Sequence, residues 1–230
     1  MTLAHCTPPA AVGASLRSLL TASTLALGLL AAAPSSATIV SGSIITGGPG
    51  ATFVKLTVPL ANPFGPANSV GNDTFQSPNL YGFDEDQNIL LAAALGVDVV
   101  PSGPLSLLAG TTVASHYIFF DPTQGSVDGT VDFDSDVLAI ITSTGLLSAS
   151  DFLANTGVNY LNPAARGLEP GDSVTISGAR QIRFDTTAST PGDYVRVLTA
   201  FSPGRVPEPA SLSLLGLALL GMGWLRKRAA

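Results

Sequence analysis

The sequence predicts a mainly β body, folded as a single antiparallel β-sandwich of jelly-roll type with one short helix. Short runs rich in β-branched and aromatic residues recur from Thr38 onward, separated by Gly, Pro and Asn every eight to twelve residues. This spacing is typical of sandwiches and barrels, whereas βαβ units would place long helical patterns between the runs. About 165 residues lie between the two apolar ends of the chain, which suits one domain and is small for two.

Ten runs have the composition of a strand, and 111–120 (TTVASHYIFF) is the strongest. Because its apolar and polar residues do not alternate cleanly, we expect a central strand that is covered on both faces. The segment 62–80 carries three prolines and two glycines, which predicts an ordered loop or an excursion at a sheet edge. The expected strands span residues 38–46, 52–60, 89–94, 97–100, 111–120, 129–134, 137–142, 172–177, 181–185 and 193–201.

One helix is expected at residues 150–155. Ser148 stands three residues before Asp151, which is the spacing of a capping box, and a carboxylate suits the positive end of the helix dipole. Phe152 and Leu153 would then face the core. Gly157 would supply the left-handed conformation that commonly ends a helix, so the pattern predicts about two turns.

The first 37 residues have the composition of a secretory signal peptide. Arg17 precedes an apolar stretch at 19–33, and the ending Pro34-Ser35-Ser36-Ala37 supplies small residues that suit cleavage between Ala37 and Thr38. An uncleaved anchor is the alternative, but this ending favours removal. Cleavage would also remove Cys6, the single cysteine, so the mature chain could form no disulfide and hold no thiolate metal site.

The last 25 residues form a second apolar segment with charged ends. Pro207, Glu208 and Pro209 precede an uncharged run at 210–225, and the cations Arg226, Lys227 and Arg228 follow it. A helix over this run would be about 25 Å long and could just cross a bilayer. Cations prefer the cytoplasmic side, so the body would lie outside. The expected domains are a signal peptide at 1–37, a β-sandwich at 38–205 and a sorting or anchoring segment with a membrane helix at 206–230.

This order of Pro-Glu-Pro, apolar run and basic cluster resembles the PEP-CTERM sorting signal of Gram-negative bacteria. The resemblance implies that an exosortase, a membrane protease-transpeptidase, recognises an inner-membrane-anchored precursor and passes it to the cell envelope or extracellular matrix. A plain C-terminal anchor is the alternative. Four segments of the body also resemble an uncharacterised domain of secreted PEP-CTERM proteins, which implies only secretion and a surface or matrix location. These segments are 72–75, 83–88, 110–117 and 191–198.

The body is acidic, with fifteen carboxylates against six cations and a net charge of −9. Phosphate backbones bind basic surfaces, so this balance excludes nucleic acid as a partner. Asp132, Asp134 and Asp136 alternate with other residues and should project from one strand face. With Asp128 they form a hypothetical calcium site, because calcium prefers carboxylate and carbonyl oxygens, although the EF-hand spacing is absent. A solvated acidic strand face is the alternative.

His116 is the one histidine left after removal of the signal. A Ser-His-Asp site would have to use it, but no Gly-x-Ser-x-Gly elbow is present. We therefore expect a strand histidine that is bonded to a backbone carbonyl. Zinc sites need several His or Cys ligands, so the sequence predicts no cofactor apart from the hypothetical calcium.

These observations predict a secreted, non-enzymatic protein of the envelope or the exopolysaccharide matrix. One alternative is a carbohydrate-active hydrolase with a carboxylate pair, although the only tryptophan, Trp224, lies in the tail and cannot stack on sugar. Another is a polysaccharide-binding or ice-binding module. Flat ice-binding faces have regular Thr-x-Thr ranks, and here only Thr111-Thr112 and Thr186-Thr187 come close.

Overall fold

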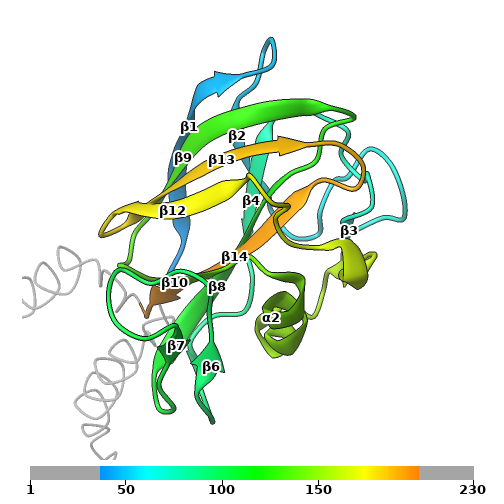
Figure 1. Ribbon diagram of the computed structural model, residues 1–230. Coiled ribbons are helices and arrows are strands. Elements are labelled where there is room, and N and C mark those ends of the chain that lie inside the picture. Colours follow the sequence, from blue (N-terminus) through cyan, green and yellow to red (C-terminus); the bar gives the residue numbers. More distant parts are fainter. Residues whose placement is uncertain (1–36, 202–230) are drawn as a thin grey trace, which may run out of the picture. The chain divides into compact units, whose positions relative to one another are not determined.

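The computed structural model describes residues 37–201 and confirms a mainly β body (Figure 1). The signal peptide before Ala37 and the tail at 206–230 lie outside the described residues. Within the described range, no helix is long and apolar enough to cross a membrane.

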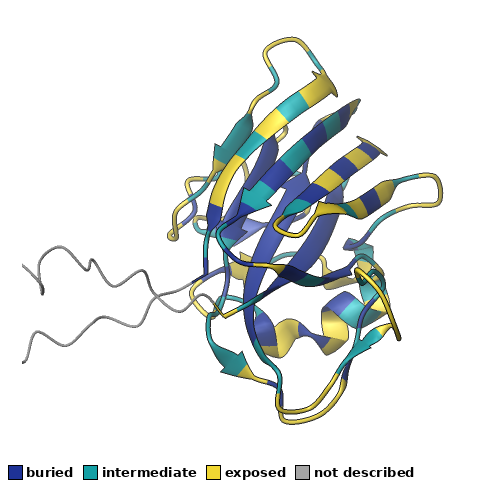
Figure 2. Ribbon diagram, turned by 90° about the vertical axis from the view of Figure 1, so that its left-hand side faces the viewer, coloured by how far each residue is buried: buried dark blue, intermediate teal, exposed yellow. Residues whose placement is uncertain are grey.

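A four-stranded sheet forms one layer of the body. Its strand order is β1-β9-β13-β12, and every neighbouring pair is antiparallel. Buried and exposed residues alternate along β9 and β13, so one face of this sheet packs on the core and the other faces solvent (Figure 2). The strands are β1 (Ile39–Gly47), β9 (Gly125–Phe133), β13 (Gln181–Ala188) and β12 (Ser173–Gly178).

A six-stranded sheet forms the second layer, in the order β10-β14-β8-β4-β2, with β5 also paired to β8. The pairing is antiparallel except between β2 and β4, which run parallel. The central strand β8 is buried on both faces along nearly its whole length, as its sequence predicts. The strands are β10 (Val137–Ile141), β14 (Asp193–Ala200), β8 (Thr112–Phe120), β4 (Leu80–Asp84), β2 (Phe53–Lys55) and β5 (Ile89–Leu90).

The central sheet is buried on both sides because it separates two apolar cores. The inner core lies between the two sheets and contains Ile118 and Phe120 of β8 together with Phe184 of β13. The outer core lies on the opposite face of the six-stranded sheet and contains Tyr117 and Phe119 of the same strand. Successive side chains of a strand point to opposite faces, so a strand that is apolar at every position can supply both cores.

A third layer of short elements covers the outer core. It contains the helix α2 and two small pairs of strands, of which β3 and β11 pair in parallel and β6 and β7 in antiparallel (Figure 1). Its elements are β3 (Ser69–Val70), β6 (Leu95–Gly96), β7 (Ser106–Leu107), α2 (Thr144–Ala149), the 3₁₀ turns η2 (Asp151–Leu153) and η3 (Pro163–Ala165), and β11 (Asn159–Tyr160).

The expected helix at 150–155 is wrong in position. The α-helix ends at Ala149 with Ser150 as its C-terminal cap, and only the 3₁₀ turn η2 lies within the expected range. The Ser150 hydroxyl donates to the carbonyl of Leu147 at 3.0 Å and satisfies the end of α2, while the Ser150 carbonyl accepts the amide of Leu153 at 2.9 Å in η2. Leu153 is buried as expected, but Phe152 is 56% exposed.

Several strand predictions also need correction. The expected strands 52–60 and 89–94 form only over Phe53–Lys55 and Ile89–Leu90. Residues 97–100 form no strand, because Val99 makes only an isolated bridge to Ile140. Conversely, β4 lies where the sequence shows no clear strand, since Gly82 interrupts its apolar pattern. A Cβ at Gly82 would lie 2.7 Å from the Ile118 side chain, so glycine is needed there to let β4 pack against β8.

Candidate functional site

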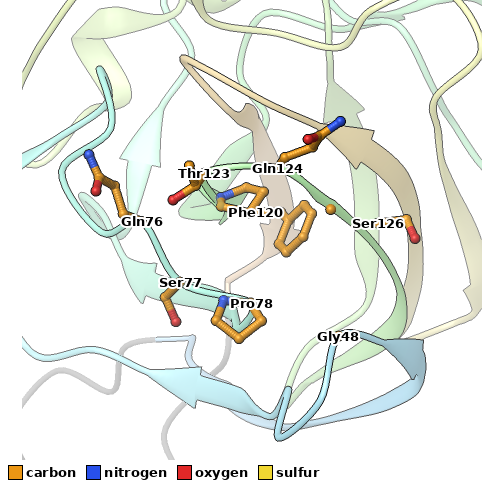
Figure 3. A pocket seen from close by; sticks show the side chains of 10 residues that line it. Gly48, Gln76, Ser77, Pro78, Phe120, Thr123, Gln124 and Ser126 are labelled. Atoms are coloured by element: carbon orange, nitrogen blue, oxygen red, sulfur yellow. The ribbon is translucent and has the colours of Figure 1, made fainter.

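Two hollows are the first places to look for a binding site. One, of about 170 Å³, lies beside the turn between β8 and β9 and is lined by Phe120, Pro78, Gln76 and Gln124, among others (Figure 3). The other, of about 380 Å³, is apolar and lies between residues 92–96 and the α2–η2 segment. Neither of these two hollows is lined by a carboxylate, a histidine or a cation.

A carboxylate, an imidazole and a hydroxyl meet at one end of the inner core. Asp84 ends β4, and His116 lies directly opposite it on β8. His116 Nδ1 lies 2.8 Å from Asp84 Oδ1, and His116 Nε2 lies 3.0 Å from Thr199 Oγ1 on β14. The ring of His116 also packs against Phe133 at 5.0 Å between centroids. Three adjacent strands therefore place the array on the face that points toward the four-stranded sheet.

Asp84 is the anionic centre of this array. Burial alone would raise its pKa, but hydrogen bonds from His116, Lys55 and the backbone amide of Ile39 outweigh burial and hold the pKa well below its usual range. The carboxylate is therefore ionised and can only accept. His116 must carry a proton on Nδ1, and in the neutral ring Nε2 accepts the hydroxyl proton of Thr199.

The array has the connectivity of a hydroxyl-imidazole-carboxylate triad, but its imidazole and hydroxyl are buried away from solvent. His116 and Thr199 are both 0% exposed, so a substrate has no path to the hydroxyl. The expectation of a structural strand histidine is consistent with this burial. Its expected partner is wrong, because both ring nitrogens bond side chains and neither bonds a backbone carbonyl.

A buried ion pair occupies the outer core. Arg196 of β14 donates from Nε and Nη2 to the two oxygens of Glu85, at 2.7 and 2.9 Å. Tyr160 and Ser115 donate their hydroxyls to the same carboxylate, each at 2.6 Å. Burial would lower the pKa of Arg196, but the adjacent carboxylate raises it above its usual value.

The same arginine also holds the third layer against the sheet. Arg196 Nη1 donates to the Ser150 hydroxyl at 2.6 Å and to the carbonyl of Leu147 at 3.1 Å. The ion pair therefore ties β14 to the end of α2. Sequence reasoning missed this pair, although a cation inside the apolar run Tyr194-Val195-Arg196-Val197-Leu198 is the signal that could have indicated it.

The four aspartates of the hypothetical calcium site do not share one strand face. Strand β9 ends at Phe133, so Asp134 and Asp136 lie in the turn that follows. Asp128 forms a bidentate pair with Arg183 at 2.8 and 2.7 Å, and Asp136 pairs with Arg180 at 2.9 Å.

The other two aspartates bind elsewhere. Asp132 accepts from Ser41 at 2.9 Å and from Gln181 at 2.8 Å, whereas Asp134 accepts the backbone amide of Thr38 at 2.8 Å. The arrangement that motivated the calcium hypothesis is therefore wrong. In residues 37–201, no group of three or more His, Cys, Asp or Glu side chains could hold a metal ion.

The predicted processing positions lie at the edges of the described chain. Ala37 is fully buried and Thr38 is half-buried at the start of β1. The sorting residues lie outside the described residues; they are Pro207, Glu208, Pro209, Arg226, Lys227 and Arg228.

Comparison with protein families identifies the tail. A family model described as the PEP-CTERM protein-sorting motif matches residues 205–228, which include all six predicted sorting residues. No curated protein and no solved structure matches the chain, so the resemblance of the body to other secreted proteins stays a prediction. The motif implies an exported, membrane-anchored precursor that an exosortase processes. The chain is a PEP-CTERM domain-containing protein.

Proposed function

We propose that the body is a non-enzymatic component of the Gram-negative envelope or exopolysaccharide matrix, delivered there by its sorting signal. The observation that carries this proposal is the burial of the side chains that could act in catalysis. His116 and Thr199 are sealed between the sheets, and Glu85 is held by Arg196 in the outer core. A glycosidase needs two carboxylates that flank a substrate cleft, and the two hollows described above have none.

The outer face of the four-stranded sheet supports contact with polysaccharide. A row of side-chain hydrogen bonds crosses this face from Ser41 to Asp132, Gln181 and Ser177, with lengths of 2.9, 2.8 and 2.9 Å. A second row joins Ser43 to Thr130 at 2.9 Å. Hydroxyl, amide and carboxylate groups in such rows offer alternating donors and acceptors, which suit sugar hydroxyls.

Expression of the full-length chain in an exopolysaccharide-producing host, with and without an exosortase, tests the delivery. We expect the mature protein outside the cell to lack the residues beyond about Pro209, as measured by intact mass. Retention of Arg226 to Arg228 on the extracellular protein contradicts the proposed processing.

Co-sedimentation of the mature protein with the purified exopolysaccharide tests the matrix role. We expect the double variant Thr130→Ala/Gln181→Ala to bind several-fold more weakly than the wild type. Ser102→Ala, an exposed change in the loop between β6 and β7 of the third layer, is the matched control. Equal binding by all three proteins rejects the sheet face as the contact, and release of reducing sugar by the wild type rejects the non-enzymatic role.

A further inference from the structure

We propose that Asp134 is a built-in receptor for the new N-terminal ammonium of Thr38, so that removal of the signal peptide completes the fold. This inference rests on the proposed cleavage between Ala37 and Thr38, and it adds a role for processing that the sorting function does not require. Hydrolysis of that bond consumes one water and leaves a carboxylate on Ala37 and an amine on Thr38. The amine is protonated at neutral pH.

Every polar group of Thr38 makes a hydrogen bond. Its backbone nitrogen donates to Asp134 Oδ1 at 2.8 Å, and its carbonyl accepts the amide of Asp134 at 3.1 Å. Its hydroxyl donates to Asp84 Oδ2 at 2.8 Å and also contacts Lys55 Nζ. The nitrogen that cleavage would expose therefore already points at a carboxylate.

The two carboxylates around Thr38 differ in their cationic partners. Two carboxylates, Asp84 and Asp134, face one cation, Lys55, whose Nζ lies 2.8 Å from Asp84 Oδ2. His116 Nδ1 also lies 2.8 Å from Asp84 Oδ1, so Asp84 has two basic partners, whereas Asp134 forms no ion pair within residues 37–201. The remaining charged groups of the turn, Asp136 and Arg180, pair with each other. An ammonium at Thr38 would supply the cationic partner that Asp134 lacks.

The burial of Ala37 indicates the order of events. This residue is fully buried in the folded body, so a peptidase could not reach the bond after it once β1 has docked. Cleavage must therefore precede the docking of β1. The ammonium would then replace a neutral amide donor in a partly buried site, where a charge-assisted hydrogen bond to a carboxylate is about twice as strong.

The expected pH dependence follows from the sign of the linkage. Asp134 favours the protonated amine, so the pKa of the α-amino group in the folded protein should exceed its usual value of about 7.7–8.0. The added stability is fully present below the pKa of the unfolded chain and is lost as the pH rises through the folded pKa. The relevant window is therefore about pH 7.5–10.

A double-mutant cycle in the exported, processed protein tests the proposal. One background begins at Thr38, and the other carries a Gly inserted between Ala37 and Thr38, so that position 38 keeps a neutral amide. Asp134→Asn is introduced into both, because asparagine can still accept a hydrogen bond from that amide. N-terminal sequencing verifies each start, and Asp132→Asn serves as the matched control.

In the chain that begins at Thr38, we expect Asp134→Asn to lower Tm by about 3–6 °C at pH 6.5 and by much less at pH 10. In the Gly-extended chain the loss should be under about 2 °C at both pH values. Lys55 is present in both backgrounds, so its contribution cancels in the comparison. Equal losses in the two backgrounds, or a mature chain that begins at another residue, overturn the proposal. Neither result bears on whether the C-terminal signal delivers the protein to the matrix.

Discussion

Single buried charges decide much of the stability of this body. The Arg196–Glu85 pair is completely buried, and Tyr160, Ser115 and Ser150 supply its remaining hydrogen bonds. A buried pair of this kind contributes modestly as a whole, but removal of one partner leaves an uncompensated charge in an apolar core. The cost of a substitution therefore depends on whether both partners are changed together.

We expect Arg196→Met to lower the free energy of unfolding by about 3–5 kcal/mol, because Glu85 would remain buried without its cation. The double variant Arg196→Met/Glu85→Gln should lose less than Arg196→Met alone, since the uncompensated carboxylate is gone. Arg183→Met, which breaks an exposed pair with Asp128, is the control and should change stability little. Urea unfolding measures all three, and an equal loss for the single and double variants would falsify this account.

Asp193 is a second residue whose charge is unfavourable in the folded state. Burial, together with the neighbouring Asp172 and Glu169, raises its pKa to about 7. Its pKa lies above that of the unfolded chain, so its favourable contribution is complete below about pH 4 and is lost as the pH rises toward 7.

Asp193→Asn should therefore raise Tm by several degrees at pH 8 and have little effect at pH 4. Thermal melts at the two pH values measure the difference. Asp185→Asn, an exposed carboxylate on β13, provides the control. A stabilisation of the same size at both pH values would show that the buried charge is not its cause.

At the scale of elements, local composition predicts the strands that are long and continuously apolar, but not the short ones. The run 111–120 becomes β8, and 193–201 and 137–142 become its neighbour β14 and the next strand β10, all within one residue at each end. The helix was misplaced because Ser148 and Asp151 match a capping box by spacing alone. In the fold Asp151 instead binds Arg166 at 2.8 and 2.7 Å, a contact between residues fifteen apart that spacing cannot reveal.

The candidate site could likewise be predicted from local sequence only in part. The sequence singles out His116 and Asp134, but it gives no indication that Asp84, Thr199 and Thr38 would join them, because these residues lie far apart in the chain. Register and sheet order bring them together, and neither is encoded in a local pattern. Glycine at position 82 likewise reflects close packing that only the tertiary structure reveals.

Substitutions in the α2–η2 segment distinguish the observed helix from the predicted one. Leu147 of α2 is fully buried in the outer core, so Leu147→Ala should cost about 2–5 kcal/mol through lost burial and a cavity. Phe152, which the sequence assigned to the core, is exposed, so Phe152→Ala should be nearly neutral. Denaturant unfolding of the two variants measures the contrast, and a large cost for Phe152→Ala contradicts the observed register.

At the scale of the whole body, the two cores share one sheet. Side chains of β8 and β14 alternate between the inner and the outer core, so neither core can lose its packing without removing support from the other. The four-stranded sheet is itself held by long-range pairing, because β9 and β13 come from distant parts of the chain and neighbour each other. The body should therefore behave as one cooperative unit.

We expect the mature protein to unfold in a single transition, with coincident loss of the β-type far-ultraviolet circular dichroism and of tyrosine fluorescence. Tyr117 and Tyr194 lie in the outer core, whereas the four-stranded sheet contributes mainly to the circular dichroism, so the two signals report on different layers. Addition of reductant should not move the midpoint, because the only cysteine lies in the predicted signal peptide. Two separated transitions would mean that the third layer and the outer core unfold while the two sheets remain packed. That result would contradict the cooperative unfolding expected when both cores share one sheet.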